Sequence, residues 1–289
     1  MVRTDYPLKN LHLFKKSNVE GKLKVVFTKL SCLCFSVICI NMILTADVLA
    51  IDLNNAFGIW LFDDGSGNIA KDSSPKRNNC NLIRSPKWVP GKFGTALDFG
   101  NGSHAVSSRK LGIRGNAHRT VVFWFQPWKE DKRQTIVAWG EKQPMKYFSV
   151  EINGPQGPKK SLFIGELRCA ANTDVPIPFK KWQHVAVVFP GGIWEAEFYL
   201  DGKRLESGAH GGNLKNQCET VDAVLGIGTN LPEKAFHFTG AIDELGIFNV
   251  ALTEEEIKKI MKQGLVGALA VASTNRLTSI WSVVKTELN

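Results

Sequence analysis

The chain has 289 residues, of which 44% are hydrophobic and 22% charged, a balance typical of a globular protein with a sizeable core. Its formal net charge is +9, but residues 1–50 carry seven Lys/Arg and three acids, so the remainder carries +9 minus +4, or +5. The basic residues of that remainder scatter singly or in pairs, such as Lys159–Lys160 and Lys180–Lys181. A basic stripe interleaved with aromatics is missing, which argues against a nucleic-acid partner.

The first 50 residues have the layout of a secretory signal peptide. A basic segment ends at Lys29, twelve apolar-rich residues follow at Leu33–Leu44, and small residues stand at Val48 and Ala50. The apolar run is shorter than the roughly 20 residues that span a bilayer. We therefore predict cleavage after Ala50 and a secreted or extracytoplasmic protein. An uncleaved signal anchor, which would be its only membrane contact, and an amphipathic surface helix are the alternatives.

From Phe57 onward, short apolar runs alternate with turn signals, a pattern that predicts an all-β sandwich or barrel. Prolines stand between these runs or at their ends, where a missing N–H breaks no ladder. The strands expected from the pattern are 56–62, 96–99, 104–106, 120–126, 134–139, 147–152, 162–167, 182–189, 195–200, 204–206, 222–228 and 239–249.

Two of these segments carry stronger local signals. Asp201-Gly202 separates two apolar runs and predicts a two-residue hairpin, because both central residues of a type I′ turn need positive φ. The run Thr120–Pro127, TVVFWFQP, has aromatics on both faces. It therefore predicts a strand that is buried on both sides.

One helix is expected, from Thr253 to Gly264. Thr253 and Glu256 form a capping box, acids fill the first turn, lysines follow, and Gly264 stops the helix. Beyond it, residues 265–289 show no clear period and are treated as a C-terminal tail. The apolar residues of the helix recur at helical spacing and predict docking on the sandwich edge: Ile257, Ile260 and Met261.

Four motifs follow one another in the order and spacing of one domain family. They are WVPGKFGTALDF at Trp88–Phe99, the Thr120–Pro127 run, KWQHVAVVFPGGIWEAEFYLDGKRL at Lys181–Leu205, and FTGAIDELGIFNVALTEEE, which begins at Phe238. Together they resemble the laminin G-like domains of the concanavalin A-like lectin/glucanase superfamily. The resemblance covers about Phe57 to Gly264 and implies a two-sheet antiparallel jelly-roll sandwich with one short C-terminal helix. The expected organisation is a signal segment at 1–50, the jelly roll at 54–264 and the tail at 265–289.

The sequence lacks the catalytic patterns that this fold can carry. Glucanases of the superfamily place Glu-x-Asp-x-Glu or a near variant on one strand face, and the chain has no such motif. Glu195 and Glu197 share a strand face but lead into the hairpin, and Asp63-Asp64 is interpreted as a solvated turn. His184 stands at the usual histidine position of the family and is interpreted as structural, with a satisfied hydrogen bond. We predict that the protein is not an enzyme.

The family resemblance also implies one structural Ca²⁺ near the chain ends. Asp72, in an early turn, and Asp243, in GAIDE, match the acidic positions, although SPKRNN follows Ser73 in place of the usual glycine-containing run. Ca²⁺ takes six to eight oxygen ligands, so backbone carbonyls and water would complete the shell. The alternative is that Asp243 simply accepts backbone hydrogen bonds.

Three cysteines remain after removal of the signal segment, namely Cys80, Cys169 and Cys218. An odd number in an oxidising compartment indicates one disulfide and one free thiol. Three pairings are possible. Cys169–Cys218 is preferred, because these two border expected strands whereas Cys80 lies in an Asn-rich loop.

Sandwich domains that bind sugars generally use exposed aromatic side chains as stacking platforms. Four tryptophans stand at strand ends or in loops and are the candidates, although such residues also plug sandwich ends: Trp88, Trp128, Trp139 and Trp194. The leading hypothesis is a secreted, non-catalytic recognition module that binds a glycan or a protein at a cell surface or in a matrix. A polysaccharide hydrolase on the same sandwich and a structural envelope component are the alternatives.

Overall fold

The computed structural model describes residues 51–270, except 129–131, 153–160, 166–169, 191–195 and 211–218. The chain divides into two compact units, Met1–Val48 and Leu49–Asn289, and all described residues belong to the second. The predicted signal segment, Trp194, Cys169 and Cys218 lie outside the described residues. Within the described part, no helix combines the length and the apolar character that a membrane span needs.

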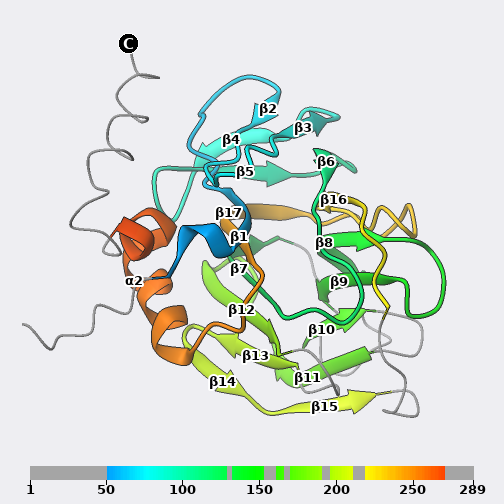
Figure 1. The fold of residues 1–289 in the computed structure, drawn as a ribbon. Helices are drawn as coiled ribbons and strands as arrows, with labels where there is room; N and C mark the ends of the chain where they lie inside the picture. The colour runs from blue at the N-terminus through cyan, green and yellow to red at the C-terminus, as the bar shows by residue number, and fades with distance from the viewer. Residues whose placement is uncertain are drawn as a thin grey trace, which may run out of the picture. The chain divides into compact units, whose positions relative to one another are not determined.

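Two antiparallel sheets form the fold (Figure 1). In the first sheet, β1 (Ala56–Trp60) pairs with β17 off the main path. The order of that path is β14 (Lys203–Leu205), β13 (Glu197–Leu200), β12 (Gln183–Phe189), β7 (Arg119–Pro127), β17 (Gly240–Phe248), β5 (Thr95–Phe99) and β4 (Lys87–Pro90).

The second sheet has nine strands in the described part of the chain, and β8 to β11 are neighbours within it. Its order is β15 (Ser207–His210), β11 (Ala170–Pro176), β10 (Ser161–Gly165), β9 (Tyr147–Ile152), β8 (Gln134–Gly140), β16 (Val224–Ile227), β6 (His104–Lys110), β3 (Cys80–Ile83) and β2 (Ile69–Ala70). The two-sheet antiparallel jelly roll predicted from the sequence is confirmed.

Each of the expected strands is present, with ends shifted by a few residues. The sequence pattern missed β2, β3, β4, β11 and β15 as strands. Most of these are short and lie at or near sheet edges, so their side chains need not alternate cleanly between core and solvent. The hairpin prediction is confirmed, because Asp201 and Gly202 have φ of 48° and 73° and connect β13 to β14.

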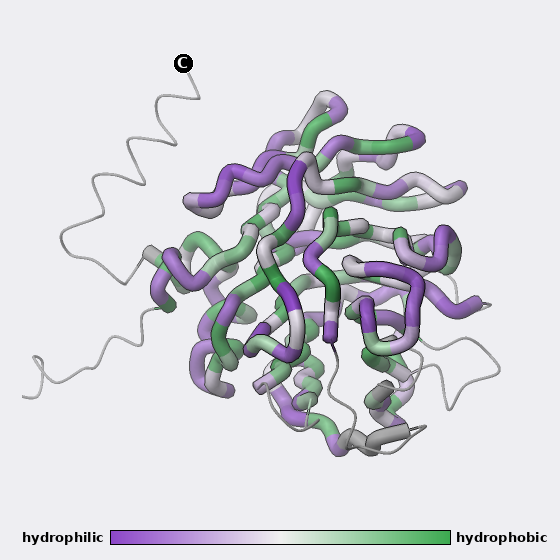
Figure 2. Tube along the Cα trace, turned by 45° about the vertical axis from the view of Figure 1, so that its right-hand side comes forward, coloured by the Kyte–Doolittle hydropathy of each residue, from purple (hydrophilic) through white to green (hydrophobic). Residues whose placement is uncertain are grey.

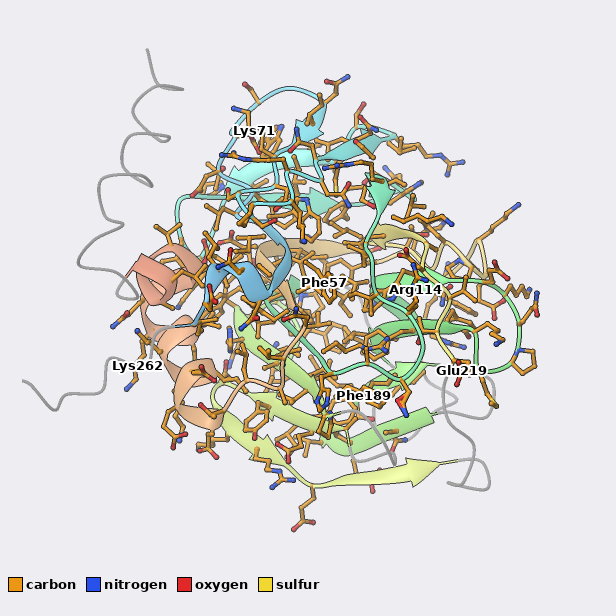
Figure 3. The ribbon with its side chains drawn as sticks, viewed as in Figure 1. Phe57, Lys71, Arg114, Phe189, Glu219 and Lys262 are labelled. Carbon is orange, nitrogen blue, oxygen red and sulfur yellow. The ribbon has the colours of Figure 1, made fainter. Side chains whose placement is uncertain are left out.

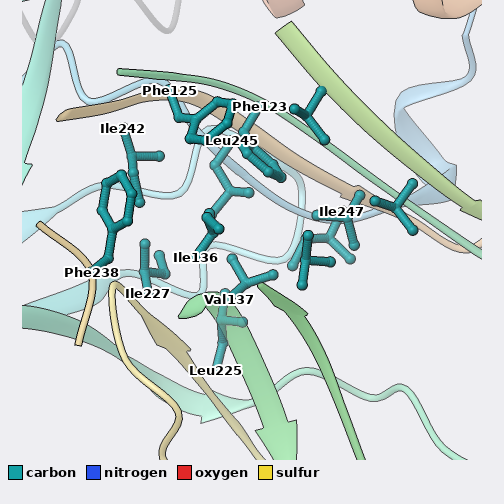
Figure 4. Packing of buried hydrophobic residues seen from close by; sticks show 14 of the residues in the cluster. Phe123, Phe125, Ile136, Val137, Leu225, Ile227, Phe238, Ile242, Leu245 and Ile247 are labelled. Carbon is teal, nitrogen blue, oxygen red and sulfur yellow. The ribbon is translucent and has the colours of Figure 1, made fainter. Parts of the chain in front are cut away.

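The main core lies between the sheets (Figure 4). Alternate residues of β7, Val121, Phe123 and Phe125, face residues of the second sheet such as Val137 and Ile227. Apolar strands lie inside and hydrophilic stretches gather in the connections (Figure 2). Every residue of β7 except Gln126 is buried, which confirms that this strand is covered on both faces.

A second cluster covers the outer face of the first sheet. It joins Val122 and Ala186 of the sheet to Ile257 and Ile260 of α2 (Glu254–Ala270), which lies beside β1 and β13 in Figure 1. Ile51, just before the short 3₁₀ turn η1 (Leu53–Asn55), belongs to the same cluster. The predicted capping box is present, since Glu256 N donates to Thr253 Oγ1 and Thr253 N donates to Glu256 Oε2.

The predicted end of the helix is corrected by the structure. Gly264 has φ 71° and ψ 171°, so it breaks the helical geometry, but the chain resumes a helical course to Ala270. Leu265, Ala268 and Leu269 are buried in the second cluster. The start of the expected tail is therefore part of the packed domain.

Candidate functional site

A polar cluster lies on the outer face of the second sheet. On β9, Phe148, Val150 and Ile152 enter the main core, so Ser149 and Glu151 face the other way. The strand register places Glu151 between Thr135 of β8 and Phe163 of β10. Glu151 is fully buried although it belongs to an outer face, and so its carboxylate must be paired within the protein.

The carboxylate of Glu151 accepts four hydrogen bonds. Arg133 donates through Nε to Oε2 and through Nη2 to Oε1 at 3.0 Å. Ser149 Oγ donates at 2.5 Å and Asn230 Nδ2 at 3.0 Å, both to Oε1. Bidentate pairing of this kind fixes the guanidinium in one plane. Glu151 thus orients Arg133 and presents no free oxygen of its own.

Arg133 lies between two aromatic rings. Its guanidinium carbon is 4.9 Å from the ring centroid of Phe163 and 4.2 Å from that of Phe236. Burial by itself would lower the pKa of Arg133, but the hydrogen bond and negative charge of Glu151 outweigh it and raise that pKa. The side chain is still 32% exposed, so a charged, pre-oriented arginine is partly accessible to solvent.

The loop that supplies Phe236 is held in an unusual conformation. Lys234 and Phe236 have φ of 54° and 56°, a region that bulky residues rarely occupy. Thr135 N donates to Phe236 O at 2.7 Å, which ties the loop to β8. Such strain persists only where the surroundings hold it in place, and here it sets an aromatic ring against Arg133.

Polar side chains complete the rim of this cluster. Tyr147 Oη donates to Glu233 Oε1 at 3.4 Å, and Lys142 Nζ lies 2.9 Å from Glu233 Oε2. Burial, followed by the charges of Glu151 and Glu233, raises the pKa of Tyr147, so its hydroxyl stays protonated. We call Arg133, Tyr147, Glu151, Phe163, Asn230, Glu233 and Phe236 the arginine cluster.

The predicted tryptophans are placed differently from one another. Trp139 is fully buried against Phe148, with ring centroids 4.6 Å apart, so its expected role as a ligand platform is corrected to that of a core residue. Trp88 and Trp128 are partly exposed. Their indole N–H groups donate to Gly67 O at 3.1 Å and to Asp98 Oδ1 at 2.7 Å. Trp194 lies outside the described residues.

The two predicted calcium ligands belong to separate hydrogen-bond networks. Asp72 is buried and accepts from the backbone of Ile59, Ser74 and Asn78 and from Ser74 Oγ, so both of its oxygens are engaged. Asp243 Oδ2 accepts from Lys92 N at 2.7 Å and Phe93 N at 2.9 Å. Its Oδ1 has no hydrogen-bond partner in the described part of the chain. An ion would find one available oxygen at Asp243, and Asp72 would first have to release its donors.

Within the described ranges, no group of three or more His, Cys, Asp or Glu side chains is arranged to hold a metal ion. Calcium at Asp72 and Asp243 therefore stays a prediction. Cys80 is a buried free thiol, while the Cys169–Cys218 pairing falls outside the described residues and also stays a prediction.

His184 and Trp124 are neighbours across β12 and β7, and Asp243 is the partner of Trp124 across β7 and β17. His184 is buried, but neither ring nitrogen has a partner among the described residues, which corrects the expected hydrogen bond. Burial lowers the pKa of His184 to about 3, so the ring is neutral at physiological pH. These three cross-strand neighbours, His184, Trp124 and Asp243, are all buried and support the fold.

The loop of Gly91 to Gly94 packs against two acidic residues, Asp243 of β17 and Asp63 in the segment after β1. A Cβ on Gly91 would lie 2.6 Å from Asp243 Oδ2, and one on Gly94 would lie 2.0 Å from Asp63 Oδ1. Gly94 also has φ 55°, which favours glycine. The two glycines of the Trp88–Phe99 motif are thus explained by the approach of carboxylates to this loop.

Sequence reasoning missed the arginine cluster. One signal was available, a glutamate at position 151 in the otherwise apolar end of a strand, because such a residue needs a partner. The identity of that partner could not be read from the sequence, since Arg133, Asn230 and Glu151 meet only through the β8–β9 pairing and the loop after β16.

A laminin G-type family model, described as the concanavalin A-like lectin/glucanases superfamily, matches residues 99–258, more than half of the chain. The chain belongs to this superfamily. No curated protein sequence matches it.

Solved structures show the same fold at low sequence identity. Domain 4 of AbnA, an extracellular arabinanase from Geobacillus stearothermophilus, aligns with TM-score 0.57 and 21% identity over 72% of this chain and 98% of that one. The binding domain of Paraclostridial Mosquitocidal Protein 1 aligns with TM-score 0.55 and 14% identity over 72% of this chain. The receptor-binding domain of a botulinum neurotoxin C/D mosaic serotype aligns with TM-score 0.53 and 12% identity over 73%. The chain covers 52% and 51% of those two binding domains.

Proposed function

We propose that the protein is a non-catalytic recognition module that binds a carbohydrate through the arginine cluster. The observation that carries this proposal is the Arg133 side chain, which is 32% exposed and whose guanidinium is fixed by a buried carboxylate and flanked by two rings. An aromatic ring beside rigid polar groups suits a sugar, whose C–H face stacks while its hydroxyls accept and donate hydrogen bonds.

Structural neighbours support binding as the role. The arabinanase domain was solved in complex with arabinotriose, and the toxin domains are described as binding or receptor-binding domains. One neurotoxin neighbour is described as entering cells through interaction with two ganglioside molecules, and another was solved with synaptotagmin. A protein partner is therefore the second candidate for the same surface.

The two carboxylates of the arginine cluster, Glu151 and Glu233, are both engaged by donors within the protein, which favours binding over hydrolysis. Glycosidases of the usual kind flank the scissile bond with two carboxyl groups. Outward positions on β9 are Tyr147, Ser149 and Glu151, and the one carboxylate among them is saturated by its donors. A polysaccharide hydrolase remains the alternative and is tested by reducing-sugar release, which we expect to be nil.

A glycan array with four variants tests the binding proposal. Phe236→Ala and Arg133→Lys should each weaken the strongest signal about tenfold, because one removes a ring and the other the bidentate, planar donor. Ile83→Ala is the matched control, an apolar truncation at a residue 38% exposed on β3. Loss of signal in Trp88→Ala but in neither cluster variant would move the site to Trp88. An array without signal, together with no sugar release, would favour a structural envelope component.

Secretion is proposed from the sequence of residues 1–50. N-terminal sequencing of exported protein should find a start at residue 51, directly after Ala50. A mature terminus outside residues 46–53, or retention of the full segment in a membrane fraction, would overturn cleavage at Ala50 and favour the signal anchor.

A further inference from the structure

Three basic side chains lie together near the turn that joins β5 to β6. His104 begins β6 and alternates with Ala105, which enters the main core, so its ring lies on the outer face of the second sheet. The rings of His104 and His237 are stacked, with centroids 5.8 Å apart. Arg84 is exposed and follows β3, whose last residue, Ile83, is the register partner of His104.

Arg84 and His237 approach the same point of the β5–β6 turn. A Cβ on Gly102 would lie 2.9 Å from Arg84 Nη1 and 3.8 Å from His237 Nε2. Gly102 has φ 76°, a conformation that favours glycine, and it places no side chain of its own between these two nitrogen atoms. The turn is closed by Ser103 N, which donates to Gly100 O at 2.9 Å. One nitrogen of each side chain is thus held within 4 Å of one backbone position.

The two histidine rings retain hydrogen-bonding capacity for a ligand. Gly102 O can only accept, so His104 Nδ1 donates to it at 2.9 Å, and Nε2 becomes a second donor when the ring is protonated. His237 Nδ1 is buried and has no partner among the described residues. A buried N–H without an acceptor is costly, which favours the tautomer that carries its proton on Nε2. The neutral His237 ring therefore already places a donor near Gly102.

No negative charge is paired with these three side chains in the part of the chain that the structure describes. Neither an ion pair nor a hydrogen bond there joins an Asp or Glu to Arg84, His104 or His237. Burial, followed by the charges of His104 and Arg84, lowers the pKa of His237. Basic groups gathered without a counter-charge produce a positive potential that attracts an anion.

We propose that Arg84, His104 and His237 bind an anionic group, a carboxylate or a sulfate ester, on the glycan that the arginine cluster recognises. The choice of a glycan rests on the proposed carbohydrate-binding function, whereas the choice of an acidic one rests on these three side chains. Phe236 of the arginine cluster directly precedes His237, and β6 lies three strands from β9 in the sheet. At about 4.8 Å per strand, β6 and β9 are roughly 14 Å apart, a distance that an oligosaccharide spans.

Binding of sulfate and of acetate to the full chain, followed by the histidine ring signals in NMR spectra at constant ionic strength, tests the site. At least one of the two anions should shift the signals of His104 and His237 and leave that of the exposed His118 unchanged. Affinity should rise about tenfold from about pH 7.5 to about pH 5.5, because protonation adds a charge and a donor. Arg84→Gln should weaken binding about tenfold, because arginine is the permanently charged member of the site.

The matched control is Arg114→Gln, which removes the same charge from a side chain that is 80% exposed in the connection between β6 and β7 (Figure 3). It should change affinity less than about twofold. An equal loss in the two arginine variants, no binding of either anion, or an affinity that does not rise at the lower pH would each overturn the proposal.

Pairs of glycans that differ by one sulfate or carboxylate test the assignment to a sugar, on an array at about pH 6. The wild type should prefer the charged member of a pair, and Arg84→Gln should lose this preference while still binding the neutral member. Arg133→Lys should weaken both members and leave binding of the small anions intact, so failure of the arginine-cluster proposal and failure of this one give different results. Binding of small anions without a preference for charged glycans would contradict the assignment to a sugar.

Discussion

The two outer faces of the sandwich treat their acidic residues in opposite ways. On the first sheet, Asp243 and Glu244 are covered and accept hydrogen bonds from the loop of Gly91 to Gly94 and from the kink of α2. On the second sheet, Glu151 is covered as well, but it holds an arginine that reaches solvent. On the first sheet, carboxylates therefore hold the Gly91–Gly94 loop and α2 in place. On the second sheet, a carboxylate supports a partly exposed cation. On the first sheet, which we interpret as the structural face, the carboxylates accept hydrogen bonds from backbone N–H groups. On the second sheet, the candidate binding face, the carboxylate pairs with an arginine.

The largest expected effect tests whether the residues after Gly264 belong to the part of α2 that packs on the first sheet. Leu265→Ala should lower the free energy of unfolding by about 3.5 kcal/mol, because a fully buried leucine leaves a cavity in the second cluster. Chemical denaturation measures this change. Val266→Ala, at a neighbour that is 49% exposed, is the control and should cost less than about 0.5 kcal/mol. Equal losses of unfolding free energy in the two variants would show that this segment does not pack on the domain.

The second effect concerns the other face. Glu151→Ala should lower the free energy of unfolding by about 2.5 kcal/mol, because Arg133 and Asn230 lose their acceptor while remaining largely buried. Lys142→Ala removes a lysine that is 61% exposed from its pair with Glu233 and should cost less than about 1 kcal/mol. Thermal melts of both variants check the difference, and a Glu151→Ala protein as stable as wild type would show that the cluster is not pre-organised by this carboxylate.

The third effect is a pH dependence confined to the covered face. Burial raises the pKa of Asp243 to about 7 and of Glu244 to about 8, above their unfolded values of 3.8 and 4.5. Both groups favour the folded state while protonated, so stability should fall as pH rises through 7 and 8. The loss is on the order of 2 kcal/mol between pH 6.5 and 8.5.

Asp243→Asn/Glu244→Gln should remove most of this slope while keeping the acceptor oxygens. His184 acts in the opposite direction, because its folded pKa is lowered from 6.5 to about 3 and stability is lost as pH falls below 6.5. Measurements of stability above pH 6.5 therefore report on the two carboxyls and not on His184. A slope that is unchanged in the double variant would contradict the assignment to these carboxyls.

The smallest effect concerns calcium on the covered face. An ion held by Asp243 would stabilise only the folded state, by about 1.4 kcal/mol at tenfold excess over its Kd. Chelator should then lower the wild-type melting temperature by a few degrees and leave Asp243→Ala unmoved. Equal melting temperatures in chelator and in millimolar calcium would leave Asp243 as an acceptor for the Lys92 and Phe93 backbone alone.

The sequence by itself determined the fold class, most of the strands, the Asp201-Gly202 hairpin and the capped start of α2. These follow from period-2 alternation, turn chemistry and helix capping, all of which act between residues close in the chain. The same local signals misplaced the helix end, because Gly264 breaks the helix locally while Leu265 and Leu269 gain enough burial to continue it.

Only the tertiary structure decided which polar residues meet. Burial of Trp139, the separate networks of Asp72 and Asp243, and the assembly of Arg133 with Glu151, Asn230 and Phe236 all depend on strand pairing and on loops that cross a sheet. The sequence gives the chemical type of each side chain. Long-range packing decides which side chains become its partners, and therefore what it can do.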